Sequence, residues 1–379
     1  MKKIYLDNAA TTPLAPEVLE VMMPFLEEDF GNPSSTHSFG RKTKNIIEIT
    51  RRNIADHLNA DPSEIIFTSG GTEADNMALR CAVTDLGVKR IITSPIEHHA
   101  VGHTAEHLKE IMNIEVDLVN IKQNGHVDLN HLESLLKKDT PTLVSLMHAN
   151  NEIGNLLPMN KVSNLCRENN AYFHSDTVQT MGHYSFDLKE LDIDFLTCAA
   201  HKIHGPKGVG FLFIKKNISI NQFITGGSQE RKHRGGTENL YGIVGLGKAL
   251  ELAFQDLKSH QNHVQKLKSY MIDELLKIDD QINFNGDITP ENSLYTVLNV
   301  CFPKNEQSSM LLFSLDIKGV AASGGSACSS GSNTGSHVLA ELSNSDNCQS
   351  IRFSFSRYTT KQEIDFALEK IKELVVLSV

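Results

Sequence analysis

A lysine between two histidines, Lys202, stands where two apolar runs are joined by a short turn. The run before it, Asp194–Cys198, and the run after it, Gly208–Ile214, both read as buried strands. Burial at the end of a core strand lowers the pKa of an amine from its reference value of about 10.4. A neutral amine can form an imine with an aldehyde, so this position suits a Schiff-base lysine. An ordinary solvated lysine in a turn is the alternative.

A cysteine in a loop is the second reactive candidate. Residues 321–336 are mostly Gly and Ser, a composition typical of a flexible loop, and Cys328 lies near their centre. Several of the other cysteines lie in apolar patterns, where reduced cysteine behaves as a small hydrophobic residue. An exposed thiol is a good nucleophile when its thiolate is stabilised. We therefore interpret Cys328 as reactive rather than as a cysteine tolerated in a surface loop.

A glycine-rich turn containing Gly70 and Gly71 joins an apolar run to a helix pattern. Glycines let backbone N–H groups approach an anion, and a helix N-terminus adds the positive end of its dipole. The turn can therefore bind a phosphate group. Thr72 and Asp75 also fit a helix-capping box, and capping alone would explain both residues.

Polar side chains follow three other predicted strands, at His98, Asn151 and Asp176. Ligands of parallel sheets bind at the carboxyl ends of the strands, so these residues can share one crevice with Lys202. An aspartate that pairs with a pyridinium nitrogen and a Schiff-base lysine are the main protein contacts of pyridoxal phosphate. His98 could stack on a flat ring or transfer protons. Each residue could instead cap a helix or form a turn.

Two further patterns carry chemistry. Arg352 interrupts an alternating strand pattern, and its planar guanidinium suits a carboxylate, although a salt bridge at the rim would also explain it. His103, Glu106 and His107 fit the H-x-x-E-H pattern of inverted zinc proteases, and His99 continues the four-residue spacing. This short pattern recurs by chance, so we expect no metal site.

The elements that must position these residues alternate between strands and helices, which predicts a largely parallel sheet covered on both faces. We expect a large domain over residues 15–250 and a smaller α+β domain, formed by residues 1–14 and 251–379, that carries the Cys328 loop. A long helix over Asn239–Asp279 connects them. The predicted strands of the large domain are Ile65–Thr68, Arg90–Thr93, Glu115–Asn120, Thr142–His148, Ala171–His174, Asp194–Cys198 and Gly208–Ile214.

Composition excludes some classes of function. The 379 residues include 36 basic and 46 acidic side chains, a net charge of −10 that argues against nucleic acid as a primary partner. No apolar run is long enough to span a bilayer, and the N-terminus lacks the apolar segment of a signal peptide. The cysteines are scattered without a Cys-x-x-Cys pair, so a reducing, cytoplasmic location is expected.

Together these motifs resemble the NifS/IscS-type cysteine desulfurases of the class V aminotransferase family. The similarity runs from Tyr5–Pro13 through Gly31–Ser35 to Arg352–Ser354, in the same order over nearly the whole chain. The stretch Gly325–Cys328 separates it from plain aminotransferases and matches the long-loop class of desulfurases. The resemblance implies the aspartate-aminotransferase-like α/β fold (pyridoxal-phosphate fold type I), with a mainly parallel seven-stranded sheet in the large domain.

The resemblance also implies how the cofactor, pyridoxal 5'-phosphate, is held. Lys202 would form an imine with its aldehyde, and Asp176 would contact the pyridinium nitrogen. Gln179 would contact the ring hydroxyl, His98 would stack on the ring, and Asn151 would add a further contact.

The phosphate would bind Gly71, Thr72 and His201, with Thr237 contributed by the second subunit of a homodimer. The family usually has a hydroxyl residue three positions before the lysine. Ala199 stands there, so one phosphate contact is lost or moved to the backbone.

The implied reaction removes sulfur from L-cysteine. Arg352, with Asn32 as a weaker candidate, would hold the substrate carboxylate, and Lys202 would move the α-proton. Attack by Cys328 would give L-alanine and a persulfide, which is passed to an acceptor protein for iron–sulfur cluster, thio-cofactor or tRNA synthesis. A selenocysteine lyase, another fold type I enzyme such as an aminotransferase, and a non-catalytic metal-binding or sulfur-carrier scaffold remain open alternatives.

Overall fold

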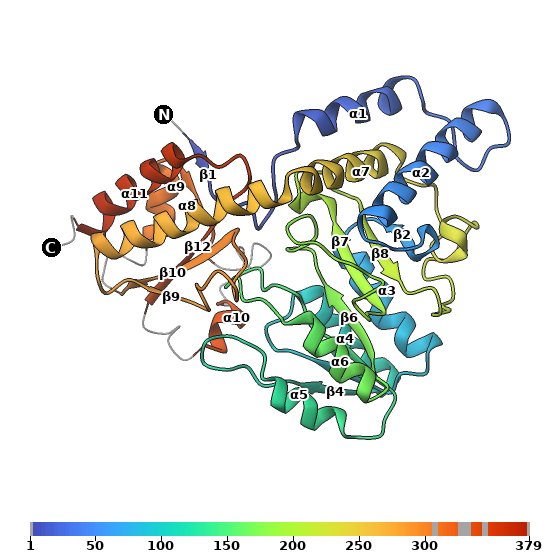
Figure 1. The fold of residues 1–379 in the computed structure, drawn as a ribbon, viewed down its shortest axis with the longest axis horizontal. Coiled ribbons are helices and arrows are strands. Elements are labelled where there is room, and N and C mark those ends of the chain that lie inside the picture. The colour runs from blue at the N-terminus through green and yellow to red at the C-terminus, as the bar shows by residue number, and fades with distance from the viewer. Residues whose placement is uncertain (1–2, 305–309, 325–334, 343–347, 377–379) are drawn as a thin grey trace.

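The computed structural model describes residues 3–304, 310–324, 335–342 and 348–376 (Figure 1). The fold of these residues is α/β. A seven-stranded sheet forms the centre of a large unit, and a three-stranded sheet lies in a smaller unit beside it. The cavity described below lies where the two units meet, and residues of both units line it.

The large sheet contains every strand predicted between residues 65 and 214, with shifts of up to three residues at the ends. Its strands are β2 (Ile65–Thr68), β3 (Arg90–Thr93), β4 (Glu115–Leu118), β5 (Thr142–Ser145), β6 (Tyr172–Asp176), β7 (Phe195–Ala199) and β8 (Gly210–Ile214). They are ordered β2-β8-β7-β6-β5-β3-β4. The five strands from β7 to β4 are parallel, whereas β8 is antiparallel to both β7 and β2. The mainly parallel seven-stranded sheet is thus confirmed.

Successive side chains of each strand point to opposite faces of the sheet, so the core of the large unit forms two layers. Ile65 and Leu196 pack on one side of the sheet, and their neighbours Ile66 and Phe195 pack on the other. Because successive side chains of a strand point to opposite faces, a strand covered on both sides needs the continuous apolar runs seen in this sequence. The first side packs against α1 (Pro16–Glu27), α2 (Ser38–His57), α5 (Leu129–Leu136), α6 (Met159–Glu168) and α7 (Leu240–Gln255), and the second against α3 (Gly71–Asp85) and α4 (His99–Met112).

The predicted helix over Asn239–Asp279 is two helices, α7 and α8 (Leu257–Ile278). They meet at Asp256, whose φ of −125° and ψ of 31° are not helical. Figure 1 shows α7 over the large sheet and α8 across the smaller unit. The connection between units is therefore a junction of two helices rather than one continuous rod. None of the described helices combines the length and the apolar character needed to cross a membrane.

The smaller unit is built on an antiparallel sheet in the order β12-β10-β9. The N-terminal arm joins this unit, because β1 pairs in parallel with β11. Its core includes side chains from α8, α9 and α11. The elements are β1 (Ile4–Tyr5), β9 (Asn283–Phe284), β10 (Val297–Pro303), α9 (Leu311–Ile317), β11 (Val320–Ala321), α10 (His337–Ala340), β12 (Cys348–Ser354) and α11 (Lys361–Val376).

Two cysteines of the smaller unit form a disulfide. Cys301 on β10 and Cys348 on β12 lie on neighbouring antiparallel strands, with their Cα atoms 5.3 Å apart. That separation is within the range of protein disulfides. The expectation that cysteines in apolar strand patterns are reduced is therefore wrong for this pair, because sequence alone did not show that the two strands are adjacent. The described cysteines Cys81, Cys166 and Cys198 are free and buried.

Candidate active site

A cavity of about 220 Å³ lies at the carboxyl ends of β5, β6 and β7. This is the position at which parallel sheets bind ligands. The cavity brings together most of the residues predicted from sequence. Those that line it are Gly71, Thr72, His98, Asn151, Asp176, Gln179, Ala199, His201, Lys202 and Arg352.

Lys202 ends a single 3-10 turn that follows β7 directly. Its Nζ donates hydrogen bonds to the carbonyl oxygens of Ala9 (2.5 Å) and Ala10 (2.8 Å). Gln179 Nε2 donates to the same Ala9 oxygen at 3.0 Å. The N-terminal arm therefore forms a wall of the cavity and holds the amine in place. Sequence reasoning placed this arm in the smaller domain but did not foresee its contact with the lysine.

Two buried carboxyl groups and an imidazole converge in the wall of the cavity. One ligand atom from each of Asp75, His98 and Asp176 lies within 4.8 Å of the other two. The pKa of Asp176 is raised to about 6, mainly by burial and next by the neighbouring Asp75 carboxylate. Burial raises the pKa of Asp75 to about 7. Asp75 Oδ1 is buried, makes no hydrogen bond among the described residues and lies 3.5 Å from His174 Nε2. A cationic N–H group in the cavity would lower the cost of burying these two acids.

His98 is held with its ring in the neutral form. Its Nδ1 accepts a hydrogen bond from the Ala100 backbone N–H at 3.1 Å, at the N-terminus of α4. Burial is the largest influence on this imidazole and lowers its pKa, while Asp176 opposes that shift. A neutral, fixed imidazole that lines the cavity fits the predicted contact with a flat ring.

The glycine-rich turn does not have the capping box that the sequence suggested. Helix α3 begins at Gly71, its N-cap is Gly70, and no side chain caps it. Thr72 is thus the second residue of the helix, and Asp75 points into the cavity instead of folding back on the turn. Gly70 has a φ of +149°, which side chains rarely adopt. The first N–H groups of the helix are left without a side-chain cap, as an anion-binding N-terminus requires.

Arg352 is buried in the cavity wall, with 1% of its surface exposed, and it forms an ion pair with Asp7 there. Its Nη1 donates to the Asn151 carbonyl oxygen at 2.8 Å, and its Nη2 donates to Asp7 Oδ1 at 2.8 Å. Its Nε is buried and makes no hydrogen bond within the described residues. On the backbone, Arg352 pairs with Ser323, which precedes the stretch that contains Cys328.

Two predicted residues, Asn32 and Thr237, do not line this cavity, and the position of a third is not described. Cys328 lies outside the described residues. Asn32 does not line the cavity, and its side chain accepts a hydrogen bond from the Ser34 N–H in its own loop. Thr237 lines a separate cavity of about 120 Å³ beside Phe67, so its contribution to a second subunit stays a prediction.

The metal pattern on α4 does not form a site in the described part of the chain. There, the only group of three metal-ligating side chains with converging atoms is the one formed by Asp75, His98 and Asp176. The ring of His103 instead stacks on that of His99, with centroids 4.7 Å apart.

Two residues of this site, Asp75 and Asp7, were not predicted from the sequence. Asp75 lies one helical turn after Thr72, which is why it was interpreted as a cap. Asp7 lies within the matching Tyr5–Pro13 stretch, but no chemistry distinguished it from its neighbours. The signal that would have found Asp75 is its placement at the start of a buried helix that follows a glycine turn, where an acid without a capping partner is costly.

The pH dependence of stability provides a test of the buried acid. Cofactor-free protein with Asp176→Asn is expected to be more stable than the unchanged protein at pH 7.5, by about 3 kcal/mol. The folded pKa lies above the ordinary 3.8, so the unfolded aspartate loses its proton first as the pH rises. The difference in free energy of unfolding between the variant and the unchanged protein should therefore grow between pH 4 and 6 and then level off. Urea unfolding of both proteins at pH 4 and 7.5 measures this difference.

Asp273→Asn, on the exposed face of α8, is the matched control and should show no such dependence. An equal stability difference at both pH values for Asp176→Asn would contradict the idea that burial disfavours the ionised carboxylate.

Comparison with known proteins agrees with this geometry. Residues 4–366 match the family model of class-V aminotransferases. A cysteine desulfurase IscS of Dictyoglomus turgidum is 44% identical over 382 residues, covering 99% of this chain and 95% of that protein. A cysteine desulfurase IscS of Methanosarcina thermophila is also 44% identical, over 99% of this chain and 92% of its own.

Solved structures give the same result. A NifS-like protein superposes with a TM-score of 0.90 at 37% identity, covering 99% of this chain and all of that one. A structure of SspA in complex with cysteine superposes with a TM-score of 0.79 at 33% identity, over 95% of this chain and 100% of its own. The family implies pyridoxal phosphate as cofactor. The chain therefore belongs to the class-V aminotransferase family and, within it, to the NifS/IscS-type cysteine desulfurases.

Proposed function

We propose that this chain removes sulfur from L-cysteine with the help of pyridoxal 5'-phosphate and leaves L-alanine and a persulfide on Cys328. One observation carries the proposal: a single cavity holds an amine, a pair of buried acids, an uncapped helix N-terminus and a buried guanidinium. These are the groups needed to hold an aldehyde, a protonated ring nitrogen, a phosphate and an amino-acid carboxylate, respectively.

The chain's own residues would hold the cofactor at both ends. Lys202 Nζ would bind its aldehyde carbon, and Asp176 would accept the hydrogen bond of its ring nitrogen, since the pocket around Asp75 favours a cation. The backbone N–H groups of Gly71 and Thr72 would bind the phosphate. When bound, the cofactor supplies an electron-withdrawing ring that stabilises negative charge at the substrate Cα.

The substrate would be oriented by Arg352 through its carboxylate, as a planar guanidinium binds it with two parallel hydrogen bonds. Lys202 Nζ, released once the amine of cysteine takes its place, would take the Cα proton. The Cys328 thiolate would attack the sulfur of cysteine, so that one C–S bond breaks while one S–S bond forms. Carbon is reduced and sulfur is oxidised in this exchange; Cβ takes up one proton from a group of the site, and Lys202 returns the Cα proton.

The reaction would involve two protein partners, a sulfur acceptor and a second copy of this chain. A sulfur-acceptor protein would take the persulfide sulfur for iron–sulfur cluster or thio-cofactor synthesis. The working unit would be a cytoplasmic homodimer in which Thr237 reaches the phosphate of the other subunit. Support for the dimer is that Thr237 borders a cavity of its own subunit other than the one that holds Lys202.

Visible absorbance followed by product analysis tests the proposal. Purified protein with pyridoxal phosphate should be yellow and should lose that colour on borohydride reduction, and cysteine should yield alanine and sulfide in equal amounts when a thiol reductant is present to reduce the persulfide. Strict dependence on a keto acid would favour an aminotransferase, and turnover of selenocysteine alone would favour a selenocysteine lyase. Protein that stays colourless and inactive with the cofactor would leave a non-catalytic scaffold as the better interpretation.

Arg352→Lys is expected to raise KM for cysteine about tenfold to a hundredfold, with a smaller change in kcat. A lysine keeps the charge but loses the paired hydrogen bonds, and one bond to a charged group contributes about 1.5–3 kcal/mol. Steady-state kinetics at saturating cofactor measures it. Arg357→Lys, beyond the end of the same strand and outside the cavity, is the control. An unchanged KM would remove Arg352 from the substrate site.

A further inference from the structure

The turn that would bind the phosphate begins at an edge strand of the sheet. Strand β2 is the first strand of the seven and pairs only with β8. An edge strand presents backbone groups that need partners. On β2 these groups are satisfied by two charged side chains from distant parts of the chain, Arg51 on α2 and Glu230. The turn Thr68–Thr72, here called the phosphate turn, begins at the last residue of this strand.

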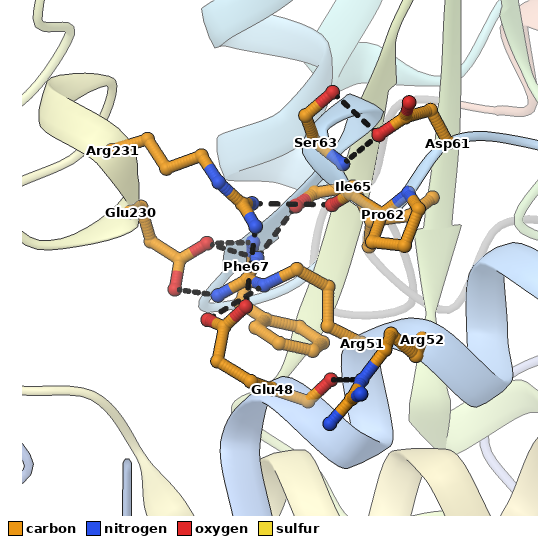
Figure 2. Close-up of polar contacts among 10 residues, drawn as sticks. All are labelled: Glu48, Arg51, Arg52, Asp61, Pro62, Ser63, Ile65, Phe67, Glu230 and Arg231. Carbon is orange, nitrogen blue, oxygen red and sulfur yellow. Dashed lines mark hydrogen bonds and ion pairs between the residues drawn. The ribbon is translucent and has the colours of Figure 1, made fainter. Parts of the chain in front are cut away.

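Arg51 and Glu230 form a buried ion pair on that edge, with 3% of each side chain exposed (Figure 2). Arg51 Nη1 and Nη2 donate to the two Glu230 carboxylate oxygens at 2.7 and 2.8 Å. Arg51 Nη1 also donates to the Ile65 carbonyl oxygen at 2.6 Å, and Glu230 Oε2 accepts from the Phe67 N–H at 2.8 Å. The pair therefore fixes the backbone of Ile65 and Phe67 on β2, just before the phosphate turn.

A second ion pair from the same segment holds the turn itself. Arg234 Nε donates to Glu73 Oε1 at 2.9 Å, and its Nη2 approaches Glu73 Oε2 at 3.3 Å. Glu73 Oε2 in turn accepts the backbone N–H of Ser69, inside the phosphate turn, at 2.9 Å. Glu73 lies in the first turn of α3, so this pair fixes the turn and the helix N-terminus together.

The backbone of this segment is itself unusual. Glu230, Arg231 and Lys232 have φ values of +45°, +53° and +69°. Each such residue costs of the order of 1–3 kcal/mol unless the surroundings enforce it, and such strain concentrates at functional sites. Residues 230–234, here called the support segment, thus adopt a costly conformation that aims Glu230 at β2 and Arg234 at α3.

We propose that Glu230 and Arg234 are positioning residues for the cofactor phosphate. They touch neither the cavity nor the cofactor. They act through Phe67 on one side of the phosphate turn and through Glu73 and Ser69 on the other, so that the N–H groups of Gly71 and Thr72 are held in place. This inference rests on the proposed function, because it takes the phosphate of pyridoxal phosphate as the ligand of the turn.

The test compares two ligands that differ only in the phosphate group. Dissociation constants of pyridoxal phosphate and of pyridoxal are measured by visible absorbance for the unchanged protein, Arg234→Gln and Glu230→Gln. We expect each variant to bind pyridoxal phosphate about tenfold more weakly and pyridoxal within a factor of two of the unchanged protein. Arg234→Lys should recover part of the loss. KM for cysteine at saturating cofactor should not change.

Glu48→Gln is the matched control. Glu48 contacts Arg51 Nε and Arg231 Nη2 in the same cluster but contacts no backbone group of β2 or of the phosphate turn (Figure 2). The Glu48→Gln variant should bind pyridoxal phosphate and pyridoxal with the same dissociation constants as the unchanged protein. Arg234 is only partly buried, so Arg234→Gln keeps the test available even when Glu230→Gln folds poorly.

Two outcomes would overturn the inference. Equal weakening for both ligands would mean that the variants disturb the whole site, and a lower melting temperature with unchanged affinity for both would mean a purely structural role. The proposed function fails separately, when the unchanged protein binds no pyridoxal phosphate at all.

Discussion

Lys202→Ala is expected to abolish the yellow colour of the protein with pyridoxal phosphate and to lower cysteine turnover by at least about 10³-fold. Two contributions are lost at once. The amine that bonds to the cofactor aldehyde is gone, and so is the base at the substrate Cα, which by itself is worth about 10²–10⁴-fold. Absorbance after borohydride treatment and alanine release measure the two losses separately.

Lys207→Ala is the control for this experiment, since Lys207 lies exposed in the same turn five residues later. It should keep both the colour and the activity. Added methylamine separates the two losses further, because a free amine can replace Lys202 as the base but cannot replace its covalent bond to the cofactor. Borohydride-stable incorporation of the cofactor into Lys202→Ala would show that another lysine forms the imine.

Cys328→Ser is expected to leave the colour intact and to reduce alanine formation by at least about 10³-fold, because a hydroxyl is a far weaker nucleophile toward sulfur than a thiolate. Addition of cysteine should still change the visible spectrum, as substrate binding does not require the thiol. Persulfide labelling followed by mass spectrometry should find sulfur on Cys328 in the unchanged protein and none in the variant.

Ser330→Ala, two residues further along the same stretch, is the matched control and should form the persulfide at a normal rate. Full turnover by Cys328→Ser would assign the sulfur acceptor to another group. Loss of colour in this variant would mean that the substitution disturbs the cofactor site as well.

Much of the fold could be predicted because the strands of the large sheet are buried on both faces. Such strands are short apolar runs, and runs like Ile65–Thr68 and Arg90–Thr93 match the structure at both ends. The join of α7 and α8 at Asp256 was not predictable, since Asp256 is neither glycine nor proline and the apolar pattern continues across it. The pairing of Ile4–Tyr5 with β11 joins residues more than 300 positions apart, which no local pattern encodes.

The grouping of the site residues was predictable because polar side chains at the carboxyl ends of neighbouring strands meet at one edge of a sheet. Lys202, Asp176 and Arg352 each had an ordinary alternative in the sequence, and only their order along the chain and the family resemblance gave them roles. The structure places all three around one cavity. Asp75 was misinterpreted because a helix cap and a buried acid look the same in sequence, and only packing separates them. The support segment was invisible for a different reason: its charged residues look like an ordinary solvated loop until their partners on α2 and α3 are known.

The bond between Cys301 and Cys348 has a consequence for how the chemistry is observed. With a sequence separation of 47 between its two cysteines, it closes a covalent ring that contains Cys328. A protease that cuts once inside the ring leaves the two pieces joined, so nicking of this stretch is visible on a gel only after reduction. The thiols commonly added to release sulfide from a persulfide also open the ring. Persulfide counts should therefore be made on protein alkylated before any reductant is added, with Cys301 and Cys348 tracked as separate peptides.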